Sequence, residues 1–561
     1  MTIKQNHPVY FIKLIIFYSI IIGLVFNFDL LIEINNYLLS SKSSVFFQIF
    51  FNFLIIISLI FFISLVLIFF GTRYLLKPLI IILLTAGAVI TYYKKTYGIT
   101  VTQGIIESLI DAIIEKNVGE INDLLSLRLA IYVILGSIIP SIPLFFIKII
   151  YPTLLKEYFY RIGLVLGMLL ILVILIFSTY KDTSLTVRST RGINKSIIPH
   201  YAMNSLFNIV QNNFFKSELT YTILDENPTI ENENEEILGV VVVGETARAD
   251  RQSLNGYSRK TNPLLENQEI VNYQNAYACG TLTKISVPCM FFLGDYTKFS
   301  EPKAKYQQNL LSLIEKAGVE TIWIENNSSC KSVCDRGTKK IDIITDQNNT
   351  YDEILLKITE DLISKKKIDS KNINFEKNRS DNFNSYLAFK KSNKKRSLIV
   401  LHIMGSHGPK YYKRYPDTFD KFKPSCKKNS PQDCTQEELS NAFDNTILYT
   451  DYILDSLINI LKKHNKKSFL IYASDHGESL GEYGLYLHGA PLSIAPKEQT
   501  HIPWLMWFSE KYKKNNDIQF LNNHEKITHE YFPHTILDAL KIKTTLFKKS
   551  KSLIISNQYS N

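Results

Sequence analysis

Long hydrophobic runs occupy the chain up to Tyr180, and shorter ones alternate with polar stretches after it. Five of the long runs each approach or exceed the about 20 residues that cross a bilayer as a helix. One such run could be a buried core helix, but five in succession with scarcely a charge inside predict transmembrane helices. No small-residue cleavage site follows the first run, so we expect it to be retained. The predicted helices cover residues 11–31, 45–71, 75–93, 129–151 and 161–180.

Basic residues and cysteines predict on which side of the membrane the rest of the chain lies. Most lysines and arginines between the predicted helices share one side if the N-terminus is cytoplasmic, with Lys42, Lys94 and Lys95 as exceptions. An odd number of helices then places everything after Tyr180 outside the cytoplasm. All six cysteines lie there in close sequence pairs, a pattern typical of an oxidising compartment. A metal site is the alternative, but the simplest pairing is three local disulfides: Cys279–Cys289, Cys330–Cys334 and Cys426–Cys434.

Two further stretches have helical patterns next to the membrane. Residues 105–126 place apolar side chains at helical spacing with acidic residues between them, which predicts a helix on the outer membrane surface or against the soluble domain. Residues 181–236 are polar and form a predicted linker, and a helix over 200–215 is expected along the bilayer. The predicted organisation is a transmembrane domain over 1–180, this linker, and a soluble domain over 237–561.

After Ile237, strand-like runs alternate with helical patterns. This alternation predicts an α/β domain with a mostly parallel sheet, in which ligands bind beyond the carboxyl ends of the strands. Glu245, His407 and the pair Asp475–His476 each follow a predicted strand closely, so we expect them at one edge. The predicted strands cover 238–244, 320–324, 397–403, 468–473 and 504–508, and the predicted helices include 305–317, 350–363 and 439–463.

Glu245, Asp475 and His476 have the chemistry of a cation site. Two carboxylates about 4 Å apart repel by about 4 kcal/mol at an effective dielectric near 20, and a divalent cation removes that penalty. Oxygen and nitrogen ligands suit a hard or borderline ion. Thr283 lies between Cys279 and Cys289, in a loop that their disulfide would close, and a nearby cation would make its hydroxyl a nucleophile. The structural alternative is that Asp475 caps a helix and His476 packs in a turn.

His407 and His488 both lie beside glycines, where the backbone can approach a ligand closely. A neutral histidine binds a cation or a phosphate oxygen, and a protonated one holds a phosphate or protonates a leaving group. Asn327 and Lys331 flank a predicted disulfide, and Lys331 is a candidate to neutralise a phosphate or is a plain surface lysine.

Taken together, these segments resemble the lipid A phosphoethanolamine transferases of the alkaline phosphatase–sulfatase superfamily. The resemblance spans nearly the whole chain, and its motifs are ordered and specific. They are Gly244-Glu245-Thr-Ala-Arg248-Ala-Asp250, Asn255-Gly-Tyr257, Cys279-Gly-Thr-Leu-Thr283, Ser286-Val-Pro-Cys-Met290, Asn326-Asn327-Ser, Gly405-Ser-His407-Gly-Pro409, Ser474-Asp475-His476-Gly-Glu478-Ser and Pro496-Lys-Glu498-Gln499.

The resemblance implies a five-helix transmembrane domain followed by a periplasmic alkaline-phosphatase-like α/β/α domain, in a monomeric bacterial inner-membrane enzyme. The donor would be phosphatidylethanolamine, whose head group would pass to Thr283 as a covalent intermediate and then to a lipid A phosphate. The added amine would weaken the attraction of cationic peptides such as polymyxin. One Zn²⁺ would be firmly bound, with a second ion possible, and the ligands would be Glu245, Thr283, Asp475 and His476.

The resemblance also implies residues that bind the substrate. His407 and His488 would serve a second metal or the phosphate. Asn327, Lys331 and Glu120 match positions that bind the donor. The chain departs from the family at Ala112, where an asparagine is usual, and this departure puts the donor contact of residues 105–126 in doubt.

Other functions remain open at this stage or are disfavoured. A related transferase could act on a core sugar, a glucan or a protein, or could transfer phosphoglycerol. A sulfatase needs a Cys-x-Pro-x-Arg setting, and Val287-Pro288-Cys289 has the wrong order. A non-catalytic scaffold would not need the intact ligand set, and a transporter would show buried charges in its helices. The net charge of +11 reflects lysine-rich surface segments such as 365–396, interpreted as a solvated insertion and not as a nucleic-acid site.

Overall fold

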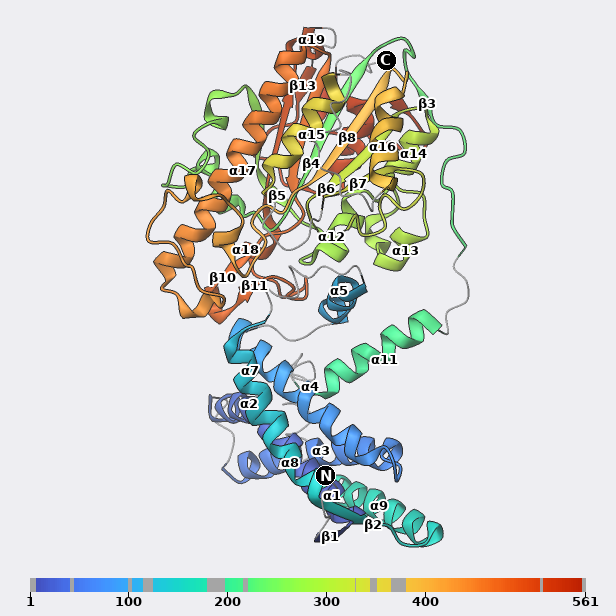
Figure 1. The fold of residues 1–561 in the computed structure, drawn as a ribbon, viewed down its shortest axis with the longest axis vertical. Coiled ribbons are helices and arrows are strands. Elements are labelled where there is room, and N and C mark those ends of the chain that lie inside the picture. Colours follow the sequence, from blue (N-terminus) through green and yellow to red (C-terminus); the bar gives the residue numbers. More distant parts are fainter. Residues whose placement is uncertain are drawn as a thin grey trace. The chain divides into compact units, whose positions relative to one another are not determined.

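The computed structural model describes residues 7–40, 45–98, 103–114, 125–178, 197–214, 220–327, 329–343, 351–364, 380–514 and 518–556. These residues divide into two compact units (Figure 1). The membrane unit contains the described residues of Met1–Ile106 and Leu125–Phe215, and the α/β unit contains those of Glu107–Leu124 and Lys216–Asn561.

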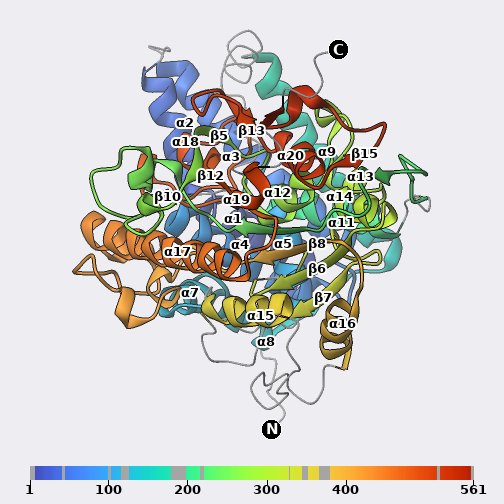
Figure 2. The ribbon, with the colours of Figure 1, turned by 90° about the horizontal axis from the view of Figure 1, so that it is seen from above.

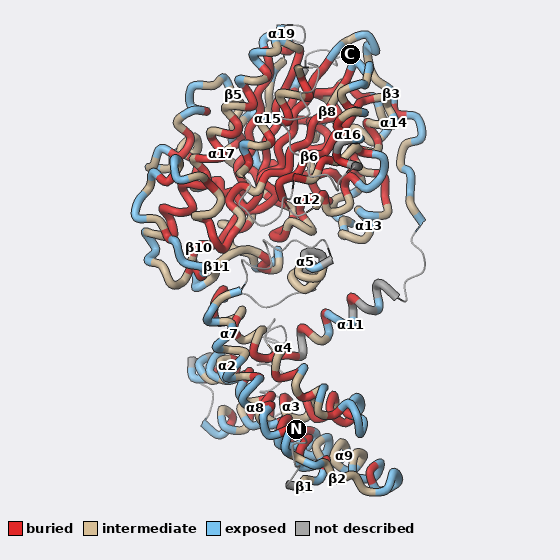
Figure 3. Tube along the Cα trace, viewed as in Figure 1, coloured by how far each residue is buried: buried red, intermediate tan, exposed pale blue. Residues whose placement is uncertain are grey.

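Among the described residues of the membrane unit, four helical segments are long and apolar enough to cross a bilayer, and a bent pair of helices near the N-terminus makes a fifth if the pair forms one span. Three are continuous helices: α3 (Val45–Phe70), α4 (Leu76–Tyr97) and α9 (Leu154–Ser178). The fourth runs from Leu127 to Phe146 through α7 (Leu127–Val133), a π-helical turn η1 (Ile134–Ile138) and α8 (Ile139–Phe146). Only 6% of the apolar window of α9 is buried within the protein, so most of its apolar surface faces outward, as lipid contact requires (Figure 3).

The first predicted transmembrane helix is broken. The continuous helix predicted over 11–31 is wrong, because α1 (Phe11–Val25) and α2 (Phe28–Ser40) meet at 54°, but the two helices together are long and apolar enough to form one bent span. Asn27 lies at the break and explains it. Its Nδ2 donates to the Ile198 carbonyl at 2.7 Å, and its Oδ1 accepts from the Ile198 N–H at 2.8 Å. This buried amide pair joins the bend to residues just before α11 (His200–Phe214).

Smaller elements complete the membrane side of the chain. Strand β1 (His7–Tyr10) pairs in parallel with β2 (Ile147–Ile150), so the fourth apolar segment ends as a helix at Phe146 and not at residue 151. The predicted interfacial helix over 105–126 is described only as α5 (Gln103–Ile114), and its remaining part up to residue 124 lies outside the described residues.

The α/β unit is built on an eight-stranded sheet with the order β14-β5-β12-β9-β4-β8-β6-β7. All strands run in one direction except β12, which pairs antiparallel with both β5 and β9. The mostly parallel sheet is therefore confirmed. Its strands are β4 (Ile237–Gly244), β5 (Ile270–Tyr277), β6 (Glu320–Glu325), β7 (Lys339–Asp342), β8 (Arg396–His402), β9 (Ser468–Ser474), β12 (His501–Phe508) and β14 (Ile527–Thr528).

Helices cover both faces of this sheet, as Figure 2 shows. Successive residues of a strand point to opposite faces of the sheet, so β4 contributes side chains to two separate hydrophobic cores, one on each face. Val241 and Val243 pack with α12 (Thr283–Met290), α14 (Leu310–Lys316) and α20 (Tyr531–Ala539). Val240 and Val242 pack with α15 (Glu353–Ser364) and α17 (Gln436–His464). The all-valine run of β4 thus predicts a central strand that is buried on both sides.

One segment differs from its predicted surface character. In the lysine-rich stretch 365–396, residues 380–391 form helix α16 (Ser380–Lys391), which packs on β7 and buries Tyr386. The prediction of a solvated insertion is wrong for this part, and residues 365–379 lie outside the described residues. The remaining short elements are α13 (Glu301–Lys305), α18 (Lys497–Thr500), α19 (Glu510–Lys514), β3 (Thr229–Ile230), β10 (Ser479–Leu480), β11 (Tyr486–Leu487), β13 (Ile518–Phe520), β15 (Ile542–Lys543) and β16 (Ile554–Ser556).

Candidate active site

The carboxyl ends of β4 and β9 bring two carboxylates together. These strands are parallel neighbours, and Gly244 pairs with Ser474 at the last position of each. Glu245 and Asp475 are the next residues, so the sheet register alone places them about one strand spacing apart. His476 follows, and its Nε2 lies 3.6 Å from Glu245 Oε1 and 3.3 Å from Asp475 Oδ2. All three side chains are fully buried.

Thr283 completes this cluster from the opposite side. It is the first residue of helix α12, and not a loop residue as the sequence suggested. Its Oγ1 lies 3.2 Å from both carboxylate oxygens of Glu245 and 3.3 Å from His476 Nε2. The side chain is half-buried, so a substrate can reach the hydroxyl. Its position at a helix N-terminus also favours negative charge that develops on or near this oxygen.

A disulfide frames the nucleophile candidate. Cys279 and Cys289 are joined across the start and the end of the segment that carries Thr283. The other two local bridges, Cys330–Cys334 and Cys426–Cys434, are also present. Cys330, Cys334 and Asp335 lie close enough to bind a metal, but the disulfide between the two cysteines removes the thiolates that would do so.

The charges of the cluster are uncompensated by the protein. Burial, followed by the neighbouring carboxylate of Asp475, raises the pKa of Glu245, and burial raises the pKa of Asp475. Burial lowers the pKa of His476 to about 4, so its ring is neutral. No ion pair within the described part of the chain joins either carboxylate to a lysine or arginine. An uncompensated buried pair of this kind is unfavourable unless a cation occupies the site.

The donor atoms fit a divalent cation. One ligand atom from each of Glu245, Asp475 and His476 lies within 4.8 Å of the others. Asp475 Oδ2 is buried and has no hydrogen-bond partner among the described residues, whereas its Oδ1 accepts from the backbone N–H groups of Thr246 and His476. One oxygen is therefore fixed by the backbone and the other is left for a ligand. Two carboxylates, an imidazole and a hydroxyl are a set that suits zinc.

Strained and crowded backbone holds Glu245 in place. Thr246 has a φ of 53°, which is unfavourable for a β-branched residue and indicates local strain at this point. Gly405 approaches so closely that a Cβ there would lie 2.9 Å from the Glu245 carbonyl oxygen. The Ser406 N–H donates to that same oxygen at 3.0 Å. The Gly405-Ser-His407 motif therefore supports the Glu245 backbone.

Two histidines face the cluster from a second direction. His488 lies next to His476, with ring centroids 4.3 Å apart, and His407 lies 5.9 Å from His488. Glu478 Oε1 lies 3.3 Å from His488 Nδ1, so this buried carboxyl orients the ring and leaves Nε2 for a ligand. Antiparallel β12 starts at the same edge, and Gln499, just before it, donates from Nε2 to the Leu487 carbonyl at 3.1 Å.

Asn327 contacts the cluster of Glu245, Asp475 and His476 directly. Its Nδ2 donates to Glu245 Oε2 at 2.8 Å and to the Ile403 carbonyl at 3.1 Å. His402, the last residue of β8, is also buried, 3.3 Å from Asn327 Nδ2 and 3.9 Å from Glu245 Oε2. Burial, and next the charge of Lys331, lower the pKa of His402 to about 3.

Comparison with known proteins identifies the family. Residues 238–542 match the Sulfatase family, and residues 59–214 match the family described as Phosphoethanolamine transferase EptA/EptB. Phosphoethanolamine transferase EptA of Escherichia coli K12 is 34% identical over 464 residues, which cover 79% of this chain and 78% of that protein. The chain belongs to the phosphoethanolamine transferase family.

Two further relatives extend the likeness over both units. Phosphatidylethanolamine transferase Mcr-1 of Escherichia coli is 32% identical over 504 residues and 86% of each chain. The structure of the integral membrane lipooligosaccharide phosphoethanolamine transferase EptA from Neisseria meningitidis matches with a TM-score of 0.84 at 28% identity, covering 98% of this chain and 99% of that chain. The prediction of a multi-pass membrane enzyme with a sulfatase-like α/β domain is confirmed.

Some site residues predicted from the family resemblance are not placed by the structure. Glu120 lies outside the described residues, and nothing is described of the Ala112 side chain within α5. The described part of α5 does reach helix α12, because Glu107 lies 3.5 Å from Lys284, the residue after Thr283. Sequence reasoning missed His402, Ser474 and His529. His402 lies in the predicted strand 397–403 and Ser474 directly follows the predicted strand 468–473, which is a usable signal, whereas nothing in the sequence points to His529.

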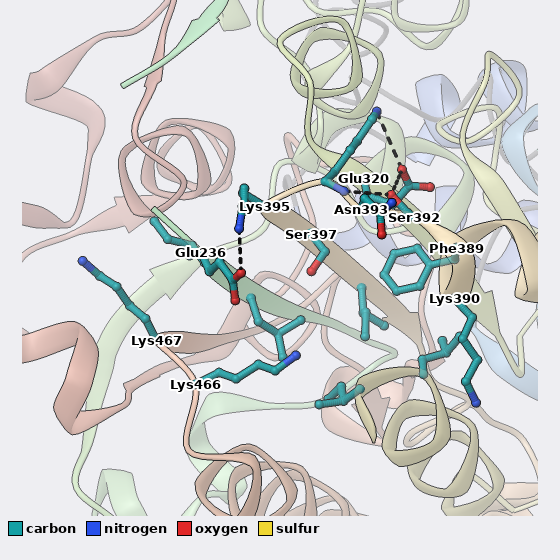
Figure 4. Close-up of a pocket in the computed structure, with 16 residues that line it drawn as sticks. Glu236, Glu320, Phe389, Lys390, Ser392, Asn393, Lys395, Ser397, Lys466 and Lys467 are labelled. Carbon is teal, nitrogen blue, oxygen red and sulfur yellow. Dashed lines mark hydrogen bonds and ion pairs between the residues drawn. The ribbon is translucent and has the colours of Figure 1, made fainter. Parts of the chain in front are cut away.

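A separate pocket of about 420 Å³ lies at the opposite edge of the sheet (Figure 4). It is lined by residues at the amino ends of β4, β6, β8 and β9, including Glu236, Glu320, Ser397 and Lys467. Its carboxylates are paired: Lys395 lies 3.1 Å from Glu236 and Lys394 lies 3.7 Å from Glu320. Its lining residues include no histidine or cysteine, so it lacks the chemistry of the family site.

Proposed function

We propose that this chain transfers phosphoethanolamine from phosphatidylethanolamine to a phosphate of lipid A, through a covalent intermediate on Thr283 at a zinc centre. The observation that carries the proposal is the position of Thr283 Oγ1, 3.2 Å from both oxygens of buried Glu245 and 3.3 Å from His476 Nε2. The names of two relatives support donor and acceptor: one is a phosphatidylethanolamine transferase and the other acts on lipooligosaccharide.

The ligands in this proposal are Glu245, Thr283, Asp475 and His476. A bound zinc ion supplies positive charge that lowers the pKa of a hydroxyl or water and neutralises the two carboxylates. Asn327 holds one oxygen of Glu245, and backbone N–H groups hold Oδ1 of Asp475, so both carboxylates keep their orientation. His407 and His488 form the phosphate-binding side, together with the charge of Lys331.

In the first step, the Thr283 hydroxyl oxygen attacks the phosphorus of the donor. The new bond joins Thr283 Oγ1 to phosphorus, and the bond from phosphorus to the diacylglycerol oxygen breaks. Glu245 accepts the hydroxyl proton, since its oxygens already lie within hydrogen-bonding distance. Burial lowers the pKa of His488 to about 4. In this proposal the negative charge of the bound phosphate diester raises that pKa, so the ring takes up a proton and gives it to the leaving oxygen, and diacylglycerol departs neutral.

In the second step, a phosphate oxygen of lipid A attacks the same phosphorus. The bond to Thr283 Oγ1 breaks, and the hydroxyl recovers its proton from Glu245. His488 regains its proton from the monoprotonated acceptor phosphate, which loses it on attack. The acceptor gains one phosphoethanolamine group, whose amine offsets negative charge at the cell surface. Cationic peptides such as polymyxin are then attracted less strongly.

Mass spectrometry of lipid A tests this function directly. Cells that express the chain should contain lipid A with one additional phosphoethanolamine unit, and cells that express Thr283→Ala at equal level should not. Unmodified lipid A in both strains would contradict the proposed acceptor. A phosphoethanolamine unit on core sugar, glucan or protein, or a phosphoglycerol unit, would replace the proposal with that related activity.

A further inference from the structure

His529 is a fully buried histidine that the proposed chemistry does not use. It follows β14, the outer strand that pairs with β5. Strand β5 in turn leads into the segment that carries Thr283. Its carbonyl accepts from the Phe532 N–H at 3.0 Å, so the residue is fixed by the start of α20. Its ring lies between two parts of the candidate site that are far apart in sequence.

Both ring nitrogens of His529 are engaged. Nε2 lies 3.0 Å from the carbonyl oxygen of Ser474, and Nδ1 lies 3.3 Å from the backbone nitrogen of Cys279. A carbonyl only accepts, so Nε2 carries the hydrogen, and Nδ1 then accepts from the Cys279 N–H. One neutral tautomer satisfies both bonds. Burial lowers the pKa of His529 to about 4, which keeps that neutral form at physiological pH.

The two partners lead directly to the two halves of the site. Ser474 immediately precedes Asp475, and its Oγ accepts from the Ala247 N–H at 2.9 Å and donates to the His476 carbonyl at 2.9 Å. Cys279 lies four residues before Thr283, and its Sγ is also 3.3 Å from His529 Nδ1. The disulfide to Cys289 ties Cys279 to the far end of α12. The ring therefore connects the ligand strand β9 to the segment that carries the nucleophile.

We propose that His529 is a positioning residue that fixes Thr283 against Asp475 and His476 by joining the Cys279 N–H to the Ser474 carbonyl. The inference rests on the proposed roles of Thr283 and of the zinc ligands. His529 touches neither metal nor substrate and acts through the backbone at both ends. Its effect is confined to the distance between the hydroxyl and the other three ligands.

Two substitutions cut this connection at opposite ends. In His529→Gln, the side-chain amide reaches toward Ser474 and keeps a donor there, but it offers no acceptor to Cys279. In His529→Asn, the amide oxygen stays near Cys279 and the contact with Ser474 is lost. The matched control is His534→Gln, because His534 is also buried in the same segment and, among the described residues, its ring hydrogen-bonds only to the Lys548 N–H, outside the site.

The test is the zinc affinity of the full-length protein, measured by competition with a chelating dye, in a double-mutant cycle with Thr283→Ala. Each His529 variant is expected to bind zinc about 10-fold more weakly than wild type, as loss of an outer support typically does. In the Thr283→Ala background the same substitutions should change affinity by less than about 2-fold. His534→Gln should leave it unchanged, and kcat should fall in the His529 variants with KM nearly constant.

The outcomes separate this inference from the proposed function. Zinc affinity within about 2-fold of wild type in both His529 variants, or losses that add fully to that of Thr283→Ala, would overturn the positioning role. A general loosening of the fold lowers zinc affinity independently of Thr283, so it gives losses of affinity that add to that of Thr283→Ala. The cycle needs neither donor nor acceptor, so a protein that fails to transfer phosphoethanolamine still decides the role of His529.

Discussion

Carboxylates lie at both the amino edge and the carboxyl edge of the central sheet, that is, at the two ends of its strands. Their negative charges are compensated differently at these two edges. At the amino edge, Glu235 lies 3.1 Å from Lys541 and also bonds to Lys467. Although burial acts to raise it, these two ammonium groups lower the pKa of Glu235. At the carboxyl edge, the pKa of Glu245 is raised by burial and by Asp475. The protein supplies its own cations at one edge, whereas at the other edge no lysine or arginine among the described residues pairs with Glu245 or Asp475.

This contrast distinguishes carboxylates that support the fold from those that serve the chemistry. A carboxylate next to lysines contributes to stability, whereas a buried pair without a cation destabilises the metal-free fold. The paired carboxylates and lysines of the amino edge therefore do not mark a catalytic site, even though the described pocket lies there. The sharpest experiments change one edge and use the other as control.

The largest effect is expected from removal of the nucleophile. Thr283→Ala should lower transfer of phosphoethanolamine at least about 1,000-fold, since loss of a catalytic nucleophile removes the covalent route. Thr283→Ser keeps a hydroxyl at the same position and should retain measurable activity. The measurement is turnover of labelled phosphatidylethanolamine by purified protein of matched thermal stability. Wild-type turnover in Thr283→Ala would contradict the assignment.

A matched pair of glutamates tests the metal assignment. Glu245→Gln removes a charged ligand and should weaken zinc binding at least about 10-fold, with loss of activity. Glu236→Gln at the amino edge removes a carboxylate paired with Lys395 and should change neither. Chelation should abolish wild-type transfer, and added zinc should restore it. Equal zinc affinities in both variants, measured by competition, would show that Glu245 is not a ligand.

The pH dependence of stability should differ with and without metal. Glu245 and Asp475 have raised pKa values in the metal-free fold, so this fold binds more protons than the unfolded chain above their ordinary values of 4.5 and 3.8. Stability of the metal-free protein should therefore fall as pH rises from about 4.5 toward neutral. Zinc should stabilise it most at the upper end of this range. Thermal unfolding of detergent-solubilised protein checks the trend, and a zinc effect independent of pH would contradict it.

The smallest effect is expected at the amino edge. Glu235→Gln removes the partner of Lys467 and Lys541 and should destabilise the protein by about 1 kcal/mol, because the pairing is partly solvent-exposed. Its depressed pKa means that wild-type stabilisation by this group is present above the unfolded pKa and is lost as pH falls. Zinc affinity and turnover should stay unchanged. A loss of zinc binding in this variant would show that the two edges are coupled.

Much of this arrangement could be predicted because local patterns determine it. The valine run of β4 and the apolar run of β9 predict buried parallel strands, and register then places Glu245 beside Asp475. The bend at Asn27 was not predictable, because its cause is a hydrogen bond to Ile198, 171 residues away. The helical start at Thr283 was missed because α12 is short and contains Pro288. His529 was missed for a similar reason, since its partners are distant in sequence.

The most direct test of the central claim is to trap the intermediate. Wild-type protein is mixed with phosphatidylethanolamine in the absence of acceptor, quenched in acid and digested for mass spectrometry. The peptide that contains Thr283 should carry one phosphoethanolamine group, localised to that side chain by fragmentation and absent after chelation of zinc. Donor turnover without any modification of Thr283, or modification of a different residue, would contradict the account.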